Sequence, residues 1–303
     1  MATVRQALDA ATLRLEASSR NPRRDAELLL MRVLGWDRAA LLTRPERILS
    51  TAETVEYQAL LTRREAAEPM QYITGVQQFF GLDFKVTREV LIPRPETELV
   101  VEALLDRVSR DQPLRIVDVG TGSGAIAVAL AHALPNSQIT AVDLSEPALA
   151  VARENAAQHG VLERVRLVHA DLLAGCAPRS FEAVVSNPPY VAGSEVLEAQ
   201  VRDYEPATAL YAGPSGLEIY EQLIPQARET LTPGGWLILE IGYGQRDAVS
   251  ALLREWADLK FQNDLQGIPR VAAARVLRGR RDAASRPFVV DGAPEDGGVE
   301  RKT

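Results

Sequence analysis

From Leu114 onward the chain alternates between short apolar segments and helical segments, and this alternation restricts the fold more than any other feature. The segments that are typical of buried strands cover residues 114–119, 138–142, 165–169, 181–186, 236–241, 259–264 and 271–277. Strands that alternate with helices form a parallel sheet with helices on its faces. The pattern therefore predicts an α/β fold with a Rossmann-like sheet of seven strands.

Residues 1–72 lack this alternation and are predicted to form a small helical bundle. Apolar residues recur at helical spacing from Val4 to Leu15. Asn21-Pro22 is expected to cap and start a second helix, and Ser50 with Glu53 forms a capping box for a third. Because the bundle carries no catalytic constellation, we interpret it as a partner-recognition domain, with plain scaffolding as the alternative.

The remaining boundaries follow from turn signals and composition. Two β-type runs, Tyr72 to Phe80 and Leu82 to Val86, lie on either side of Gly81 and predict a hairpin. We therefore expect a linker at 73–92 and a catalytic domain at 93–281. The polar, Gly- and Pro-bearing residues 282–303 are predicted to be a disordered tail.

The charge balance and the cysteine content restrict partners and compartment. The net charge is −7, with 34 basic against 41 acidic residues, which argues against long-range attraction to nucleic acid. The single cysteine, Cys176, excludes an internal disulfide and fits a reducing compartment. Three scattered histidines make a metal site unexpected. No apolar stretch of membrane-spanning length and no signal-peptide layout is found, so we expect a cytoplasmic monomer.

A glycine-rich loop, Gly120-Thr121-Gly122-Ser123-Gly124, stands between the first strand and an Ala-rich helix. Glycines allow a tight turn and a close approach of the backbone to a ligand, beside free helix amides. The third glycine comes one residue earlier than in the dinucleotide fingerprint, so a pyrophosphate is not the expected ligand. Asp118 just before the loop suits a cationic amino group instead.

Acidic residues close the next two strands. Asp143 ends the second strand, where an acid would hold both hydroxyls of a ribose. Asp171 follows the third strand and would accept from an adenine amino group, with Leu172 packed on the base. Each aspartate alone would be interpreted as a cap or turn residue. Together with the glycine loop they indicate an adenosyl amino acid, S-adenosylmethionine.

The fourth strand runs into Asn187-Pro188-Pro189-Tyr190. The prolines fix φ and contribute no donor, so the Asn187 amide oxygen and the Pro188 carbonyl can accept both hydrogens of a planar –NH2 group. Tyr190 would cover that group with its ring, and Pro189 completes the expected substrate contacts. An amide nitrogen is a weak nucleophile because its lone pair is delocalised. We therefore expect Asn187, Pro188 and Tyr190 to promote methyl transfer by geometry and fixed dipoles.

Three strings occur in a characteristic order: Ile92 to Glu98, Asp118 to Gly124 and Ser186 to Tyr190. With these strings, over roughly residues 5–278, the chain resembles the bacterial peptide chain release factor glutamine methyltransferases. Two further segments, Pro22 to Glu27 and Gly267 to Arg270, are also similar to that family.

The resemblance implies an S-adenosylmethionine-dependent methyltransferase that acts on N5 of the glutamine in the Gly-Gly-Gln motif of class-I release factors. It also implies cofactor contacts from Gly120 to Gly124, Asp143, Leu172 and Asn187, and substrate contacts from Asn187 to Tyr190. Relatives often carry tryptophan at the position of Leu172, so apolar packing replaces stacking there.

Other interpretations stay open from the sequence. A sister family methylates a ribosomal-protein glutamine with the same active-site string, and adenine N6 or guanine N2 methyltransferases use a similar nitrogen clamp on a flipped base. A non-catalytic S-adenosylmethionine-binding module is a third class. Glu96 and Glu98 either stabilise the start of a helix or line the mouth of the site.

Overall fold

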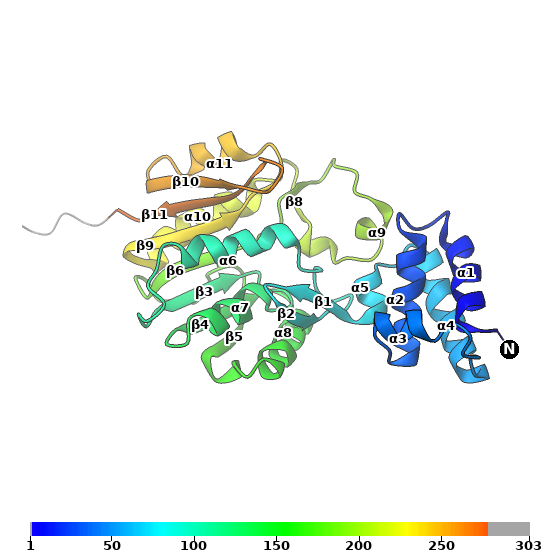
Figure 1. Cartoon of the computed structure of the whole chain (residues 1–303). Coiled ribbons are helices and arrows are strands. Elements are labelled where there is room, and N and C mark those ends of the chain that lie inside the picture. The colour runs from blue at the N-terminus through cyan, green and yellow to red at the C-terminus, as the bar shows by residue number, and fades with distance from the viewer. Residues whose placement is uncertain (1, 278–303) are drawn as a thin grey trace, which may run out of the picture.

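A seven-stranded sheet forms the centre of the larger domain in the computed structural model, which describes residues 2–277 (Figure 1). Its strand order is β10-β11-β9-β6-β3-β4-β5. The strands are β3 (Arg115–Val119), β4 (Gln138–Asp143), β5 (Val165–His169), β6 (Phe181–Ser186), β9 (Leu231–Glu240), β10 (Ala257–Asn263) and β11 (Pro269–Arg275). Neighbouring strands from β5 to β9 are parallel, whereas β11 pairs antiparallel with both β9 and β10. The predicted α/β class and seven strands are confirmed.

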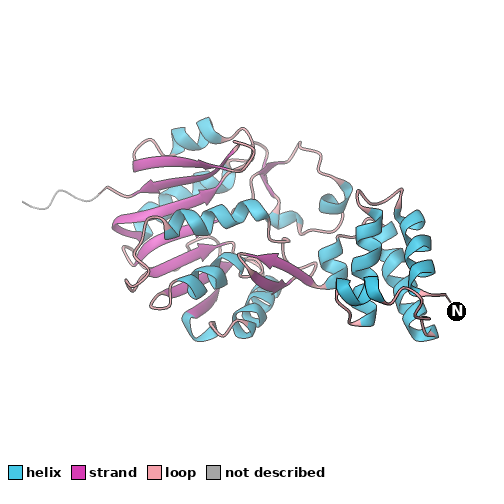
Figure 2. Ribbon diagram, in the orientation of Figure 1, coloured by secondary structure: helices cyan, strands magenta, loops and turns pink. Residues whose placement is uncertain are grey.

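Helices cover both faces of this sheet (Figure 2). Strand residues alternate between two apolar clusters, because successive side chains of a strand point to opposite faces. Ile116 packs with α6, α7 and α8, and Val117 packs with α10 and α11. The helices are α6 (Glu98–Leu105), α7 (Ala125–Ala133), α8 (Glu146–Gln158), α10 (Glu218–Thr230) and α11 (Arg246–Leu252).

The N-terminal residues form the predicted helical bundle, which lies at one end of the molecule in Figure 1. It contains α1 (Val4–Leu15), α2 (Pro22–Leu34), α3 (Arg38–Thr43), α4 (Thr51–Glu65) and α5 (Met70–Thr74). Ser50 and Glu53 form the capping box expected for α4. Asn21 is the N-cap residue of α2 and Pro22 its first residue, as predicted, but the Asn21 side chain makes no cap hydrogen bond; its backbone N–H donates to Ser19 Oγ.

A hairpin of β1 (Val76–Phe79) and β2 (Leu82–Lys85) joins the bundle to the sheet domain, as predicted. Phe80 and Gly81 both adopt positive φ, as a tight two-residue hairpin turn requires. The prediction that the first strand begins at Tyr72 is wrong. Those residues belong to α5, and the Tyr72 hydroxyl donates to the Val90 carbonyl at 2.6 Å. Gly75 ends this helix as a left-handed C-cap, so the first strand begins only at Val76.

An insertion that the sequence did not reveal follows β6. It contains β7 (Val191–Ala192), α9 (Ala199–Arg202), a 3₁₀ turn (Ala207–Ala209) and β8 (Tyr211–Gly213). It reaches the bundle, because the Tyr204 hydroxyl donates to the Ala66 carbonyl at 2.6 Å. No helix within residues 2–277 has the length and apolarity to cross a bilayer. The predicted tail at 282–303 lies outside the described residues.

Candidate active site

Two cavities meet at the carboxyl ends of the parallel strands, where ligands bind in open α/β sheets. The first has a volume of about 450 Å³ and lies against the glycine loop. The second, of about 540 Å³, lies beyond the end of β6. Leu91, Asn187 and Ala209 line both cavities, so these three residues form the boundary between them.

The glycine loop presents its backbone to the first cavity. Gly120 and Gly122 line it with φ of +69° and +55°, a conformation that suits only glycine without strain. A Cβ at either position would meet no protein atom within 4 Å, so the space beside both is free for a ligand. Gly124 instead packs against α8, where a Cβ would lie 3.1 Å from Ala152 Cβ. Thr121 and Ser123 are buried behind the loop.

Asp118 is completely buried beneath this loop. Its Oδ2 accepts hydrogen bonds from Thr121 Oγ1 at 2.6 Å and from the Ala127 N–H at 3.2 Å. Burial raises the pKa of Asp118 to about 7, although these two hydrogen bonds oppose the rise. Within residues 2–277, Oδ1 has no hydrogen-bond partner. This unpaired oxygen lies beneath the loop, and Asp118 is not among the residues that line the cavity, so its charge can act on a cationic ligand group only through the loop.

The predicted strand-end acids line the same cavity. Asp143 is held in place by two backbone donors, since Oδ2 accepts from the Gly122 N–H at 2.8 Å and Oδ1 from the Ser145 N–H at 2.9 Å. Asp171 and Leu172 also line it, and Leu172 adopts φ of +49°. The rest of the wall is largely apolar: Val90, Leu91, Val119, Val142, Leu144, Ala148, Ala170 and Ile219. The fixed Asp143 and the exposed Asp171 beside an apolar wall fit the ribose and base of an adenosyl group.

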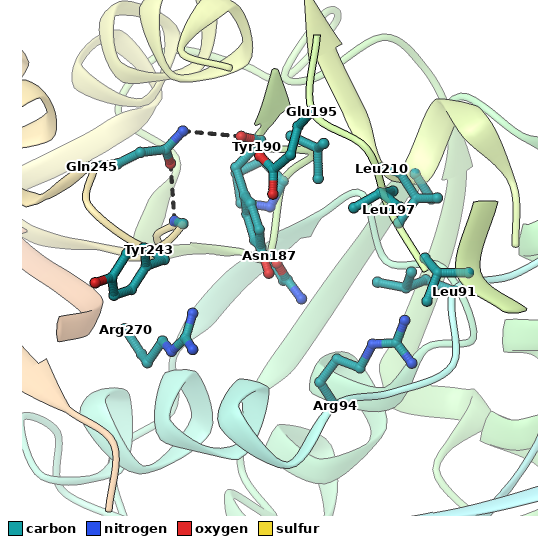
Figure 3. A pocket seen from close by; sticks show the side chains of 15 residues that line it. Leu91, Arg94, Asn187, Tyr190, Glu195, Leu197, Leu210, Tyr243, Gln245 and Arg270 are labelled. Carbon is teal, nitrogen blue, oxygen red and sulfur yellow. Dashed lines mark hydrogen bonds between the residues drawn. The ribbon is translucent and has the colours of Figure 1, made fainter. Parts of the chain in front are cut away.

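The second cavity contains Asn187, Pro188 and Tyr190 (Figure 3). Pro189 lines the first cavity instead, because successive residues of the turn face different sides. Polar and charged side chains of both signs also line the second cavity: Arg94, Glu195, Tyr243, Gln245 and Arg270. Gln245 fixes the turn, because its Nε2 donates to the Tyr190 carbonyl and its Oε1 accepts from the Gly242 N–H (Figure 3).

A buried acid behind Asn187 was not predicted from the sequence. The register pairs Ser186 of β6 with Leu239 of β9, so the next residues, Asn187 and Glu240, emerge side by side. Thr97 lies between them: its Oγ1 accepts from Asn187 Nδ2 at 3.0 Å and donates to Glu240 Oε2 at 2.6 Å. The Tyr190 hydroxyl donates to Glu240 Oε1 at 3.2 Å.

Burial has the largest effect on the pKa values of Glu240 and Tyr190. It raises the pKa of Glu240 to about 7, against the opposing effect of the hydrogen bonds from Thr97 and Tyr190. Burial also raises the pKa of Tyr190 above its usual value, with the nearby Glu240 charge adding to the rise. In the sequence, Glu240 is visible only as an acid near the end of an apolar strand. That position does not reveal which side chains Glu240 contacts.

Glu96 and Glu98 lie in the first turns of the 3₁₀ segment Pro95–Thr97 and of α6, in agreement with the interpretation that they stabilise the start of a helix. Glu98 Oε1 accepts from the Phe80 N–H at 2.7 Å and so ties the hairpin to α6. Neither glutamate is among the residues that line the two cavities. The cation of the same segment is the one that reaches the second cavity: Arg94 pairs with the buried Glu205 of the insertion at 2.6 Å.

A seven-stranded α/β sheet with a glycine loop and strand-end acids defines an S-adenosylmethionine-dependent methyltransferase, and the chain is an enzyme of this class. Two family models match it: the PrmC N-terminal domain at residues 6–75 and the methyltransferase small domain at residues 95–204. The solved delta-N METTL16 MTase domain shares the fold, with a TM-score of 0.50 and 20% identity over 65% of this chain and 89% of that chain.

Curated relatives define the family more narrowly. The chain is 47% identical over 277 residues to the release factor glutamine methyltransferase of Koribacter versatilis, covering 90% of this chain and 98% of the relative. It is 40% identical over 262 residues to the protein of the same name in Escherichia coli K12, covering 85% of this chain and 94% of the relative. The chain belongs to the release factor glutamine methyltransferase family.

Proposed function

We propose that the protein transfers a methyl group from S-adenosylmethionine to the side-chain amide nitrogen (N5) of the glutamine in the Gly-Gly-Gln motif of class-I release factors. The observation that carries this proposal is the position of Asn187, whose side chain lines both cavities. A methyl donor in the first cavity and an amide in the second would meet at this residue. The names of the relatives support the choice of acceptor.

In the first cavity the chain binds and orients the donor. The backbone at Gly120 and Gly122 leaves room for close approach, Asp143 holds the ribose hydroxyls, and Asp171 with Leu172 holds the base. Asp118 attracts the amino group through the loop, while Thr121, Ser123 and Gly124 shape the turn. When bound there, S-adenosylmethionine supplies an electrophilic methyl group.

In the second cavity the chain orients the acceptor nitrogen. The Asn187 amide oxygen and the Pro188 carbonyl accept its two N–H groups, so the nitrogen is held in one direction. The same two oxygens stabilise the positive charge that develops on it, because their dipoles are already in place. Tyr190 packs over the amide with a ring held by its hydrogen bond to Glu240, and Pro189 lines the cavity of the donor.

The surroundings support a protein loop as the substrate. The second cavity is large enough for a side chain with flanking backbone, and Arg94 and Arg270 provide donors for peptide carbonyls. We propose that residues 1–72 recognise the release factor and that residues 93–281 form the catalytic domain. Residues 73–92 would link these two domains. We further propose that the enzyme works as a cytoplasmic monomer without direct binding to nucleic acid.

The test is a transfer assay with methyl-labelled S-adenosylmethionine. It offers purified release factor, its Gln→Ala variant in the Gly-Gly-Gln motif, and total RNA as separate acceptors. We expect label on the release factor alone and none on the variant. Label in RNA would refute the proposal in favour of a nucleobase acceptor, and label in neither would direct the search to ribosomal-protein glutamines.

The Asn187 amide oxygen and the Pro188 carbonyl together form what we call the clamp, and the clamp is tested separately with Asn187→Ala. Turnover should fall by orders of magnitude while cofactor affinity falls much less. Asn136→Ala, which removes an exposed amide far from both cavities, is the matched control and should keep wild-type turnover. Wild-type turnover in Asn187→Ala would show that the amide does not position the acceptor.

A further inference from the structure

Two buried side chains stand directly behind the proposed clamp. Glu240 is 2% exposed and Thr97 is 4% exposed. Neither is among the residues that line the two cavities, so neither would touch donor or acceptor. Both are nevertheless hydrogen-bonded to residues that do line the second cavity, Asn187 and Tyr190.

The burial of Glu240 is costly for the fold. A carboxyl group without a partner cation loses its hydration on burial, and packed apolar residues often replace such groups without loss of stability. Within residues 2–277, no arginine or lysine forms an ion pair with Glu240. Stability alone therefore does not explain why an acid occupies this position. The hydrogen bonds that Glu240 accepts from Thr97 and Tyr190 do explain it.

The direction of each hydrogen bond follows from the chemistry of Glu240. An ionised carboxylate only accepts, so the hydroxyl groups of Thr97 and Tyr190 must both donate to it. Thr97 has a single hydroxyl proton, which it donates in the hydrogen bond to Glu240. Thr97 can then only accept from Asn187, which must turn its NH2 group inward, as the structure shows.

This direction decides which atom of Asn187 is left for the substrate. With Nδ2 turned toward Thr97, Oδ1 is the atom that remains to accept an N–H from an acceptor amide. The opposite flip would present NH2 to NH2, a donor against a donor, and the clamp would repel its substrate.

We infer that Thr97 and Glu240 are positioning residues, which together fix the flip of the Asn187 amide through a relay of hydrogen bonds from β9 to the clamp. Tyr190 is the second arm of this relay, because the same carboxylate holds its ring. The inference rests on the proposed function, since it concerns the orientation of the clamp that this function requires.

The test compares two variants of Thr97, one that keeps the volume without the hydroxyl and one that keeps the hydroxyl without the methyl group. Thr97→Val removes the hydroxyl at nearly unchanged volume, and Thr97→Ser keeps it. At pH 8, where Glu240 is mostly ionised, we measure kcat and KM with a release factor, the Kd for S-adenosylmethionine, and the melting temperature. We expect Thr97→Val to lower kcat by about tenfold or more. Its Kd for the donor should stay within about twofold of wild type, because the first cavity is unchanged.

Rescue by the conservative variant separates this relay from a merely structural role. Thr97→Ser should keep kcat close to wild type. Glu240→Gln keeps only one acceptor oxygen, so its amide can accept from Thr97 or from Tyr190 but not from both, and it should lower kcat by a smaller factor than Thr97→Val. Wild-type kcat in Thr97→Val, or an equal loss in Thr97→Ser, would overturn the relay.

The outcomes also separate this inference from the proposed function. A release factor that is methylated by wild type, is not methylated by Asn187→Ala, and is methylated normally by Thr97→Val refutes the relay and leaves the function standing. A release factor that wild type does not methylate refutes the function and the relay with it.

Discussion

A methyl group placed on Gly120 should separate cofactor binding from folding. Gly120 lines the first cavity at φ of +69°, and a Cβ there would meet no protein atom within 4 Å. Alanine at positive φ costs about 1–2 kcal/mol of folding free energy. The added methyl would also enter the space that a ligand needs, and such overpacking typically costs about 1–3 kcal/mol.

Gly160 is the matched control for the backbone cost. It follows α8 at φ of +67°, a Cβ there also meets nothing within 4 Å, and it lies outside both cavities. Gly120→Ala and Gly160→Ala should therefore lose similar stability. For a domain of this size the loss corresponds to roughly 2–8 °C in melting temperature.

The assay pairs thermal unfolding with titration calorimetry of S-adenosylmethionine. We expect Gly120→Ala to weaken the Kd by about 5- to 150-fold, and Gly160→Ala to leave it within about twofold of wild type. Unchanged affinity in Gly120→Ala would refute the placement of the donor against this loop. An equal loss in both variants would show that strain, and not the added methyl, controls binding.

Three further results are expected. Because burial raises the pKa of Glu240 and of Asp118 to about 7, their contribution to stability is complete below about pH 4 and is lost as the pH rises through 7. As the pH rises through this range, the unfolding free energy should fall by on the order of 3–4 kcal/mol for each carboxyl. Glu240→Gln should flatten this pH dependence, and a profile as steep as that of wild type would contradict the assignment. Arg94→Ala leaves Glu205 buried without its cation and should lower the unfolding free energy by about 3–5 kcal/mol. Adding Glu205→Gln should recover part of this loss. Chemical denaturation measures both variants, and no recovery would argue against the Arg94–Glu205 ion pair. Tyr243→Ala changes a side chain that is 78% exposed and lines the second cavity. It should reduce kcat/KM for the release factor and change the unfolding free energy by less than about 0.5 kcal/mol. Unchanged kcat/KM in steady-state kinetics would show that Tyr243 does not contact the release factor.

Much of the fold could be predicted because its signals are local. Several strands of the sheet are short apolar runs that end at a turn residue, and the bounds of β6 match the predicted 181–186. The structure begins β9 at Leu231, five residues before the predicted start, because the strand continues through Pro233-Gly234-Gly235. The capping box at Ser50 and the tight turn at Gly81 were visible for the same reason, since each depends on residues a few positions apart. Local signals failed where partners were distant. The Tyr72 segment has β-type residues but forms a helix, and the insertion after β6 has no periodicity to detect.

The candidate site divides in the same way. The glycine loop and the Asn187 string are contiguous, so their chemistry could be interpreted from the sequence alone. The side-chain partners of that string are not contiguous: Thr97 and Glu240 lie 143 positions apart. Only the pairing of β6 with β9 brings Asn187 beside Glu240, and only the position of the segment before α6 places Thr97 between them. The sequence by itself determined which residues end the strands, because strand ends are local. The tertiary structure decided which of those ends meet, because the order and register of strands depend on contacts between residues far apart in the chain.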